Sequence, residues 1–216
     1  MQTVTKSLDI RGKTITTFVV FDVVAQLRMM VEGDVLELIT DQYEPIWRDI
    51  SAWSEATGQK LLSVEEVEAG RRFLIEKGTA DHTSTRMAMV VSSSGLEELL
   101  SPLGFALAAA LEGIDLNLFI QGPAVRVLTK DYRPRLKGWA RPFSRFAAAG
   151  MAKTGHISPQ NKLRQIHGLG GNIYMCGPSM EHFKVKREEL IFDDLPIVEY
   201  FTFMSIMEKS DIQLYS

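Results

Sequence analysis

Residues 87–122 read MAMVVSSSGLEELLSPLGFALAAALEGIDLNLFIQG, and this stretch decides the fold of the larger part of the chain. A short apolar run ends in Ser and Gly, a helical segment follows, and a second apolar run (residues 114–122) comes after it. This order predicts two parallel strands that are joined by a right-handed crossover helix. Downstream, residues 158–176 repeat the helix and strand order, a helix is expected from about Pro178, another near residues 198–209, and DIQLYS (residues 211–216) is expected as a last strand. We therefore expect an α/β domain with an open, mostly parallel sheet at residues 87–216.

The first 77 residues predict a different kind of domain. Apolar residues recur at helical spacing until Gly33 and again until Gly58, and β-rich runs lie before, between and after these helices. Residues 60–77 alternate as a hairpin that turns near Ala69 and Gly70. We expect a two-layer α+β domain at residues 1–77. Residues 78–86 are small and polar without periodicity and are expected to form a linker.

Composition places the chain among globular proteins. Of its 216 residues, 45% are hydrophobic and 24% are charged, values that exclude disordered and fibrous classes. The start of the chain lacks a secretory signal pattern, and no apolar run approaches the roughly 18 residues that a membrane span needs. We expect a cytoplasmic protein.

The single cysteine, Cys176, stands in GNIYMCGPSM (residues 171–180). Ligands of open α/β sheets lie beyond the carboxyl ends of the strands. Pro178 suits a first helical turn, so Cys176 is expected next to the N-terminus of a helix, where positive potential favours a nucleophilic thiolate. We expect it to be at least partly accessible. The alternative is a buried residue at a strand end, because free cysteine is among the most buried residue types.

Further candidate residues follow from the same sheet edge. Strand ends are expected at Ser92, Ser93, Ser94 and Gly122, where they are candidates for hydrogen-bonding an anionic sulfur species. Gly177 is expected to supply a tight turn or a close approach for a partner's sulfur, and His182 lies six residues after the cysteine. The four histidines lack the spacing of metal ligands, so no metal site is expected. No cofactor is expected either.

The second domain resembles the DsrE/DsrF-like sulfur-relay family. The resemblance lies in Cys176, Gly177, Pro178, Ser179 and Met180, which form a C-x-x-S-M motif after an apolar strand, and in the order of elements over residues 87–216. It implies that Cys176 carries sulfur as a persulfide, that Ser179 belongs to the site, and that the protein forms symmetric homo-oligomers.

The first domain is similar to the small sulfur carriers of the TusA-like family, through LDIRG (residues 8–12), EGD (residues 32–34) and DISAWSEATG (residues 49–58). That family bears a Cys-Pro that is expected here at about Ile15 and Thr16, and both residues are absent. The resemblance therefore implies a docking, regulatory or assembly role for a domain that carries no sulfur.

A basic segment interrupts the second domain. Residues 125–165 hold ten Lys or Arg against Asp131 alone, although the net charge of the whole chain is −3. Aromatic residues lie among the cations, so the segment is a candidate for an anionic membrane surface or an acidic partner, with nucleic acid disfavoured. A solvated loop is the other interpretation.

These patterns and resemblances favour two alternative functions. In the first, the protein is a sulfurtransferase-like relay that passes persulfide sulfur from a donor protein to an acceptor protein on Cys176. In the second, it is a noncatalytic binding or assembly protein that uses the basic segment for recruitment, and Cys176 is structural. The broad apolar surface of residues 197–207 predicts a homo-oligomer in either case.

Overall fold

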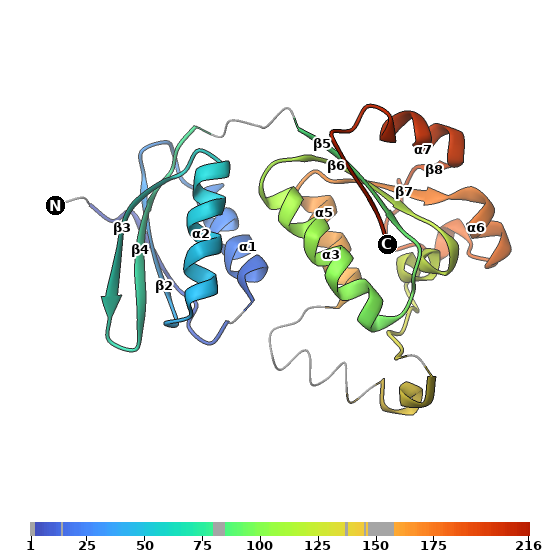
Figure 1. The fold of residues 1–216 in the computed structure, drawn as a ribbon, viewed down its shortest axis with the longest axis horizontal. Coiled ribbons are helices and arrows are strands. Elements are labelled where there is room, and N and C mark those ends of the chain that lie inside the picture. Colours follow the sequence, from blue (N-terminus) through green and yellow to red (C-terminus); the bar gives the residue numbers. More distant parts are fainter. Residues whose placement is uncertain (1–2, 14, 80–84, 137, 145, 147–157) are drawn as a thin grey trace. The chain divides into compact units, whose positions relative to one another are not determined.

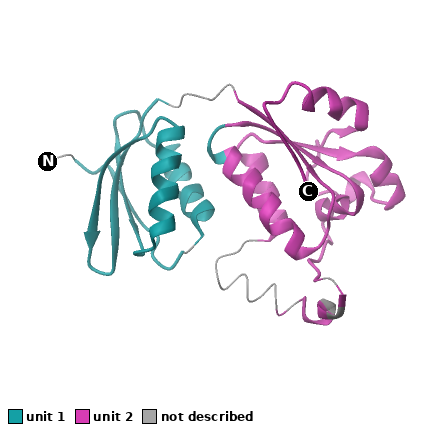
Figure 2. Cartoon of the chain, in the orientation of Figure 1, with its two compact units in different colours: residues 1–83, 111–113, 154–156 teal, residues 84–110, 114–153, 157–216 magenta. Residues whose placement is uncertain are grey.

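The computed structural model describes residues 3–13, 15–79, 85–136, 138–144, 146 and 158–216. These residues form two compact units, one built from the elements between Lys6 and Glu76 and the other from those between Arg86 and Tyr215 (Figures 1 and 2). Each unit has its own sheet.

The first unit is a two-layer α+β fold. Its elements are β1 (Lys6–Asp9), α1 (Thr16–Leu27), β2 (Val35–Thr40), α2 (Glu44–Ala56), β3 (Lys60–Val67) and β4 (Gly70–Glu76). The sheet has the order β1-β2-β4-β3, with β1 parallel to β2 and the other pairs antiparallel. Both helices lie on one face of it (Figure 1), and the core between the layers is made of fully buried aliphatic and aromatic side chains (Val19, Leu36, Leu38, Ile46, Ile50, Phe73, Ile75).

The hairpin between β3 and β4 turns where the sequence predicts it. Ala69 adopts a φ of 57°, and a Cβ on Gly70 would lie 2.4 Å from the backbone oxygen of Thr40 on the neighbouring strand. Because that distance is far inside van der Waals contact, the close approach of two backbones requires glycine at this position.

The second unit is an α/β fold whose sheet is entirely parallel. Its strands are β5 (Arg86–Val91), β6 (Asp115–Ile120), β7 (Asn172–Cys176), β8 (Ile197–Val198) and β9 (Ile212–Tyr215), in the order β8-β7-β6-β5-β9. The helical elements are α3 (Leu96–Leu111), η1 (Gly122–Leu128), η2 (Gly138–Phe143), α5 (Pro159–Gly168), α6 (Gly177–His182), η3 (Arg187–Glu189) and α7 (Tyr200–Met207). Five consecutive residues of β5 and of β6 are buried, as expected of strands that are covered on both faces.

Helices cover the two faces of this sheet. The crossovers through α3 and α5 both run toward β8, so right-handed connections place these helices on the same face, and the Lys162 Nζ of α5 donates a hydrogen bond to Leu100 O of α3 at 3.0 Å. The connection through α7 runs back across the sheet to β9, which places α7 on the opposite face. There Phe203 packs against Ala88, Val90 and Phe119.

The predicted fold classes of both domains are confirmed, and three details differ from the prediction. Strand β8 was not expected because two residues are too few to show an alternating pattern. Helix α1 ends at Leu27 instead of continuing to Val31, and the apolar Met29 and Val31 are 66% and 70% exposed. In the basic segment, where a solvated loop was one interpretation, η2 is a 3-10 helix, and the 3-10 helix η1 ends within the segment.

Some predictions fall on positions outside the described residues. Residues 80–84 of the expected linker are among them, as are residues 137, 145 and 147–157 of the basic segment. The domain boundary at residues 78–86 stays a prediction.

Candidate functional site around Cys176

Cys176 lies at the carboxyl end of β7, at the turn into α6. It is the last residue of the strand and the N-cap residue of the helix, and Pro178 occupies the first helical turn. Parallel pairing with β8 sets Cys176 opposite Val198. The cysteine therefore lies at the carboxyl end of a parallel strand and at the start of a helix, as the sequence predicts.

The side chain of Cys176 is fully buried, at 0% exposure, so the expectation that it is partly accessible is wrong. It belongs to an apolar cluster with Ala88, Val90, Phe119 and Phe203. The first three come from strands, but Phe203 comes from α7, the helix that crosses this face of the sheet. A strand-to-helix turn is normally open to solvent at its tip, and here a later helix of the chain covers it.

A short chain of hydrogen bonds leads to the sulfur. The backbone N–H of Gly122, just after β6, donates to Ser179 Oγ at 2.8 Å, and Ser179 Oγ donates to Cys176 Sγ at 3.1 Å. Because the N–H of Gly122 occupies the serine oxygen as an acceptor, the hydroxyl proton of Ser179 is directed to the sulfur. A hydroxyl donor of this kind stabilises negative charge on sulfur.

Tyr200 supplies a second polar group. It is the first residue of α7, two residues after the strand partner of Cys176, and its ring meets Phe119 edge-on at 6.3 Å between centroids. A hydrogen bond with Cys176 and the charge of Cys176 raise the pKa of Tyr200. With a raised pKa, the phenol keeps its proton at neutral pH. We did not predict this role from the sequence, although the start of a helix after a neighbouring parallel strand was the available signal.

The remaining candidate residues divide into two groups. Gly122 is brought to the site through Ser179; its φ of +54° favours glycine, and a Cβ there would lie 3.4 Å from Ser92 O. The serines of the β5 edge have other partners. Ser92 Oγ donates to the backbone oxygen of Ser216 at 2.6 Å, Ser93 Oγ pairs with the Glu98 carboxylate, and Ser94 O accepts from the Tyr132 hydroxyl at 3.0 Å.

Gly177 and His182 lie on α6. The φ of Gly177 is not in the left-handed region, and a Cβ there would make an ordinary contact of 3.5 Å with Ile197 Cγ2, so the predicted tight turn does not require glycine. His182 is exposed, and its ring packs edge-on against Phe183 at 4.8 Å. Beside Gly177, a shallow hollow of about 420 Å³ is lined by residues that include Met180, Lys184, Val185 and Ile197.

Metal-ligand clusters and membrane-spanning helices are absent from the described part of the chain. Within it, no group of three or more His, Cys, Asp or Glu side chains is arranged to hold a metal ion. No helix among the described residues is both long and apolar enough to span a membrane.

Comparisons with known proteins identify the families that the two parts of the chain match. The model of the DsrE/DsrF-like family matches residues 85–214, and that of the sulfurtransferase TusA family matches residues 17–77. Among solved structures, the ychN protein from E. coli is similar at 17% identity and a TM-score of 0.46, over 61% of this chain and 99% of that one. No curated protein matches the chain.

Both matching families are sulfur-relay families, which supports a general role in sulfur transfer with donor and acceptor proteins. The chain thus belongs to the DsrE/DsrF-like family and carries a TusA domain in front of it.

Proposed function

We propose that this protein is a cytoplasmic sulfur relay in which Cys176 holds sulfane sulfur as a persulfide between a donor protein and an acceptor protein. The position of Cys176 carries the proposal, because the one cysteine of the chain ends a strand of the DsrE/DsrF-like domain and lies within hydrogen-bonding distance of Ser179. Serine and tyrosine hydroxyls beside a cysteine suit a sulfur atom that must carry negative charge.

The chemistry consists of two thiolate attacks. The Cys176 thiol loses its proton to solvent, and the thiolate attacks the outer sulfur of a donor persulfide. A new S–S bond forms on Sγ, the donor's S–S bond breaks, and the donor leaves as a thiolate. In the second step an acceptor thiolate attacks the outer sulfur on Cys176, and Cys176 leaves as a thiolate. The sulfane sulfur keeps its oxidation state throughout, so neither step needs an oxidant or a reductant.

The hydrogen bond from Ser179, which is not on α7, has a part in both steps. Each step begins or ends with a charged sulfur at Cys176, and hydrogen bonds to charged groups contribute about 1.5–3 kcal/mol each. The Gly122 N–H, which donates to Ser179 Oγ, keeps the serine hydroxyl pointed at the sulfur as a donor. These groups act by stabilising the thiolate as nucleophile and as leaving group.

Access to the sulfur requires α7 to move. Within α7, Phe203 is the buried residue and Ile206 and Met207 are half-buried, while Tyr200, Phe201 and the rest are exposed. A helix of eight residues that is held mainly by one side chain is a weakly anchored element, and such elements open at a lower free energy than the core. We propose that the donor or acceptor reacts with Cys176 when α7 is displaced.

The burial of Cys176 in an apolar cluster also favours a second candidate function. A cysteine with this environment suits a noncatalytic binding or assembly protein that is recruited through its basic segment to a membrane surface or an acidic partner. The two candidates differ in whether the sulfur of Cys176 ever reacts.

Intact-mass spectrometry distinguishes them. The full-length protein is incubated with a persulfide donor under conditions that load a known sulfur carrier, beside the Cys176→Ser variant. The relay predicts that the wild-type chain gains the mass of one sulfur atom and that the variant gains none. A wild-type mass that does not change would reject the relay and leave the assembly function.

A further inference from the structure

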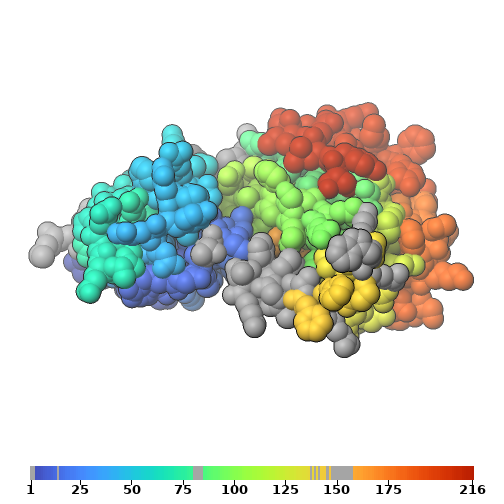
Figure 3. Space-filling view, turned by 60° about the horizontal axis from the view of Figure 1, so that its bottom comes forward, coloured from blue at the N-terminus to red at the C-terminus, as the bar shows by residue number. Residues whose placement is uncertain are grey.

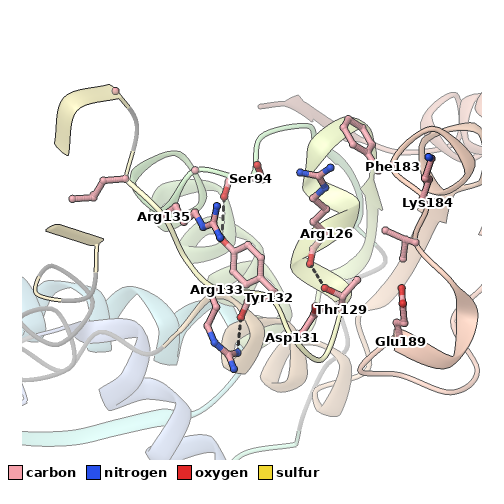
Figure 4. Close-up of a pocket in the computed structure, with 14 residues that line it drawn as sticks. Ser94, Arg126, Thr129, Asp131, Tyr132, Arg133, Arg135, Phe183, Lys184 and Glu189 are labelled. Carbon is pink, nitrogen blue, oxygen red and sulfur yellow. Dashed lines mark hydrogen bonds between the residues drawn. The ribbon is translucent and has the colours of Figure 1, made fainter. Parts of the chain in front are cut away.

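A basic hollow on the second unit lies apart from the cysteine. Its volume is about 640 Å³, within the range of small-molecule sites. It is formed by the loop after β5, by η1 and the loop that follows it, and by the segment after α6, and its lining includes Arg126, Tyr132, Arg133, Arg135, Lys184 and Glu189. In the view of Figure 4, Arg126 and Lys184 lie on one side of Tyr132, and Arg133 and Arg135 lie on the other.

The backbone that carries these side chains is held in place. Arg135 forms a bridge with Gly95, and its carbonyl accepts the N–H of Leu96 at 3.0 Å. On the other side, Thr129 forms an antiparallel bridge with Leu190. The Tyr132 hydroxyl donates to Ser94 O at 3.0 Å, and burial raises the pKa of Tyr132 to about 12, so this bond persists at neutral pH.

Arginine side chains in this hollow have unused donors. The guanidinium of Arg126 lies over the Phe183 ring at 5.0 Å from its centroid, a contact that fixes the group without using its N–H donors. Arg133 donates one hydrogen bond, to Tyr132 O at 3.1 Å. Among the described residues, none of the ion pairs involves the four cations of the hollow (Arg126, Arg133, Arg135, Lys184).

Two carboxylates limit what the hollow accepts. Glu189 is already engaged, since its carboxylate accepts the backbone N–H of Lys186 at 3.0 Å, and Asp131 is exposed at the rim. Four cations against two acids leave a net charge of +2. A ligand that balances this charge carries at least two negative charges, and guanidinium forks match phosphate and carboxylate groups.

We propose that this hollow binds a small multivalent oxyanion, whose phosphate or carboxylate groups are held by Arg126, Arg133, Arg135 and Lys184. The convergence of these cations from separate segments onto one concave site favours a compact ligand over an extended surface. The site lies apart from the sulfur relay, because among the described residues the hydrogen-bond partner of Cys176 and the buried members of its apolar cluster do not line the hollow.

Isothermal titration calorimetry of the full-length protein tests the proposal, with inorganic pyrophosphate and citrate as probes at about 100 mM NaCl. We expect binding with a dissociation constant below about 1 mM, weakened as salt screens the charges. An Arg126→Gln/Arg135→Gln variant is expected to bind at least about tenfold more weakly, because each substitution removes a charged hydrogen-bond donor. Arg164→Gln is the matched control, since Arg164 is an exposed arginine of the same unit outside the hollow.

The outcomes separate the possibilities. Tighter binding of pyrophosphate identifies a phosphate ligand and tighter binding of citrate a carboxylate ligand, and both support the proposal. Absence of binding of both pyrophosphate and citrate, or equal weakening of binding in the Arg164→Gln variant, would overturn it. The same titration on Cys176→Ser should match the wild type, so that failure of this site and failure of the relay are read separately.

Discussion

Replacing Phe203 by alanine tests whether α7 controls access to Cys176. The Phe203 ring is 2% exposed, stacks on Phe119 at 4.6 Å and 15°, and meets Tyr174 at 5.9 Å. It is the buried residue of α7 and shares a cluster with Cys176. The substitution therefore removes the main anchor of the helix and uncovers the sulfur in one step.

The size of the effect follows from the lost packing. Phe→Ala substitutions in a core cost about 3–5 kcal/mol. At the lower value, and if the cost falls on the docked state of α7, the equilibrium for local opening rises by about a hundredfold, since each 1.4 kcal/mol is a factor of ten. The rate at which Cys176 reacts should rise by the same factor when reaction is slow relative to closing.

The assay is the reaction of the native protein with a chromogenic disulfide reagent, followed by absorbance, beside thermal unfolding by circular dichroism. Phe201→Ala is the matched control, because Phe201 lies in the same helix but is 90% exposed, and its rate should equal that of the wild type. Leu107→Ala is a second control that lowers global stability from the buried face of α3. If Phe203→Ala reacts no faster than the wild type, or only as fast as Leu107→Ala, then α7 is not the cover.

Four further outcomes are expected. In the Phe203→Ala background, Ser179→Ala should slow the alkylation of Cys176 about tenfold, because a hydroxyl donor to a charged sulfur is lost. Ser179→Thr should restore part of the rate. An unchanged rate in Ser179→Ala would remove Ser179 from the site. Burial raises the pKa of Tyr132 to about 12. The protonated phenol therefore contributes to stability below pH 10, and this contribution is lost as the pH rises from about 10 through about 12. Denaturant titrations should show that the free energy of unfolding falls less over this range in Tyr132→Phe than in the wild type. Limited proteolysis should cut first near residues 81–85, and a first cut inside residues 3–79 would contradict the predicted boundary. Light scattering should report a homo-oligomer. The reason is apolar surface near the end of the chain, red in Figure 3, where four large side chains are 53–90% exposed (Tyr200, Phe201, Met204, Tyr215). A monomer mass of about 24.2 kDa at micromolar concentration would reject this expectation.

Most of the fold could be predicted from hydrophobic periodicity and turn residues. Both βαβ crossovers, the hairpin at Ala69 and the turn into α6 are encoded within short windows of sequence. What could not be predicted was β8, whose two residues are defined by pairing with β7 instead of by their own pattern. Local signals specify long elements, and tertiary contacts specify the short ones.

The candidate site shows the same division. The placement of Cys176 at a sheet edge and a helix start follows from the motif that surrounds it. The burial of Cys176 does not follow from this motif. The covering residue, Phe203, is 27 positions further along the chain, on the helix that connects β8 to β9 across the sheet. The serines that follow β5 were candidates by the same rule, but the hydroxyls of Ser92 and Ser93 are bonded to Ser216 and Glu98, and the backbone oxygen of Ser94 accepts from Tyr132.

The TusA domain adds a restriction on where sulfur can be held. The family match begins at residue 17, directly after Ile15 and Thr16, the positions at which the carrier Cys-Pro is expected. Ile15 is the residue before α1 and its side chain makes no capping bond, so the start of this helix offers an aliphatic group where the family would offer a nucleophile. Fold and chemistry are therefore separable in this domain: its core residues keep the two layers together, and the one thiol of the chain, on which a persulfide could form, lies in the other unit. Because Cys176 is the sole thiol of the chain, any sulfur found on the protein after reaction with a persulfide donor must have been accepted there.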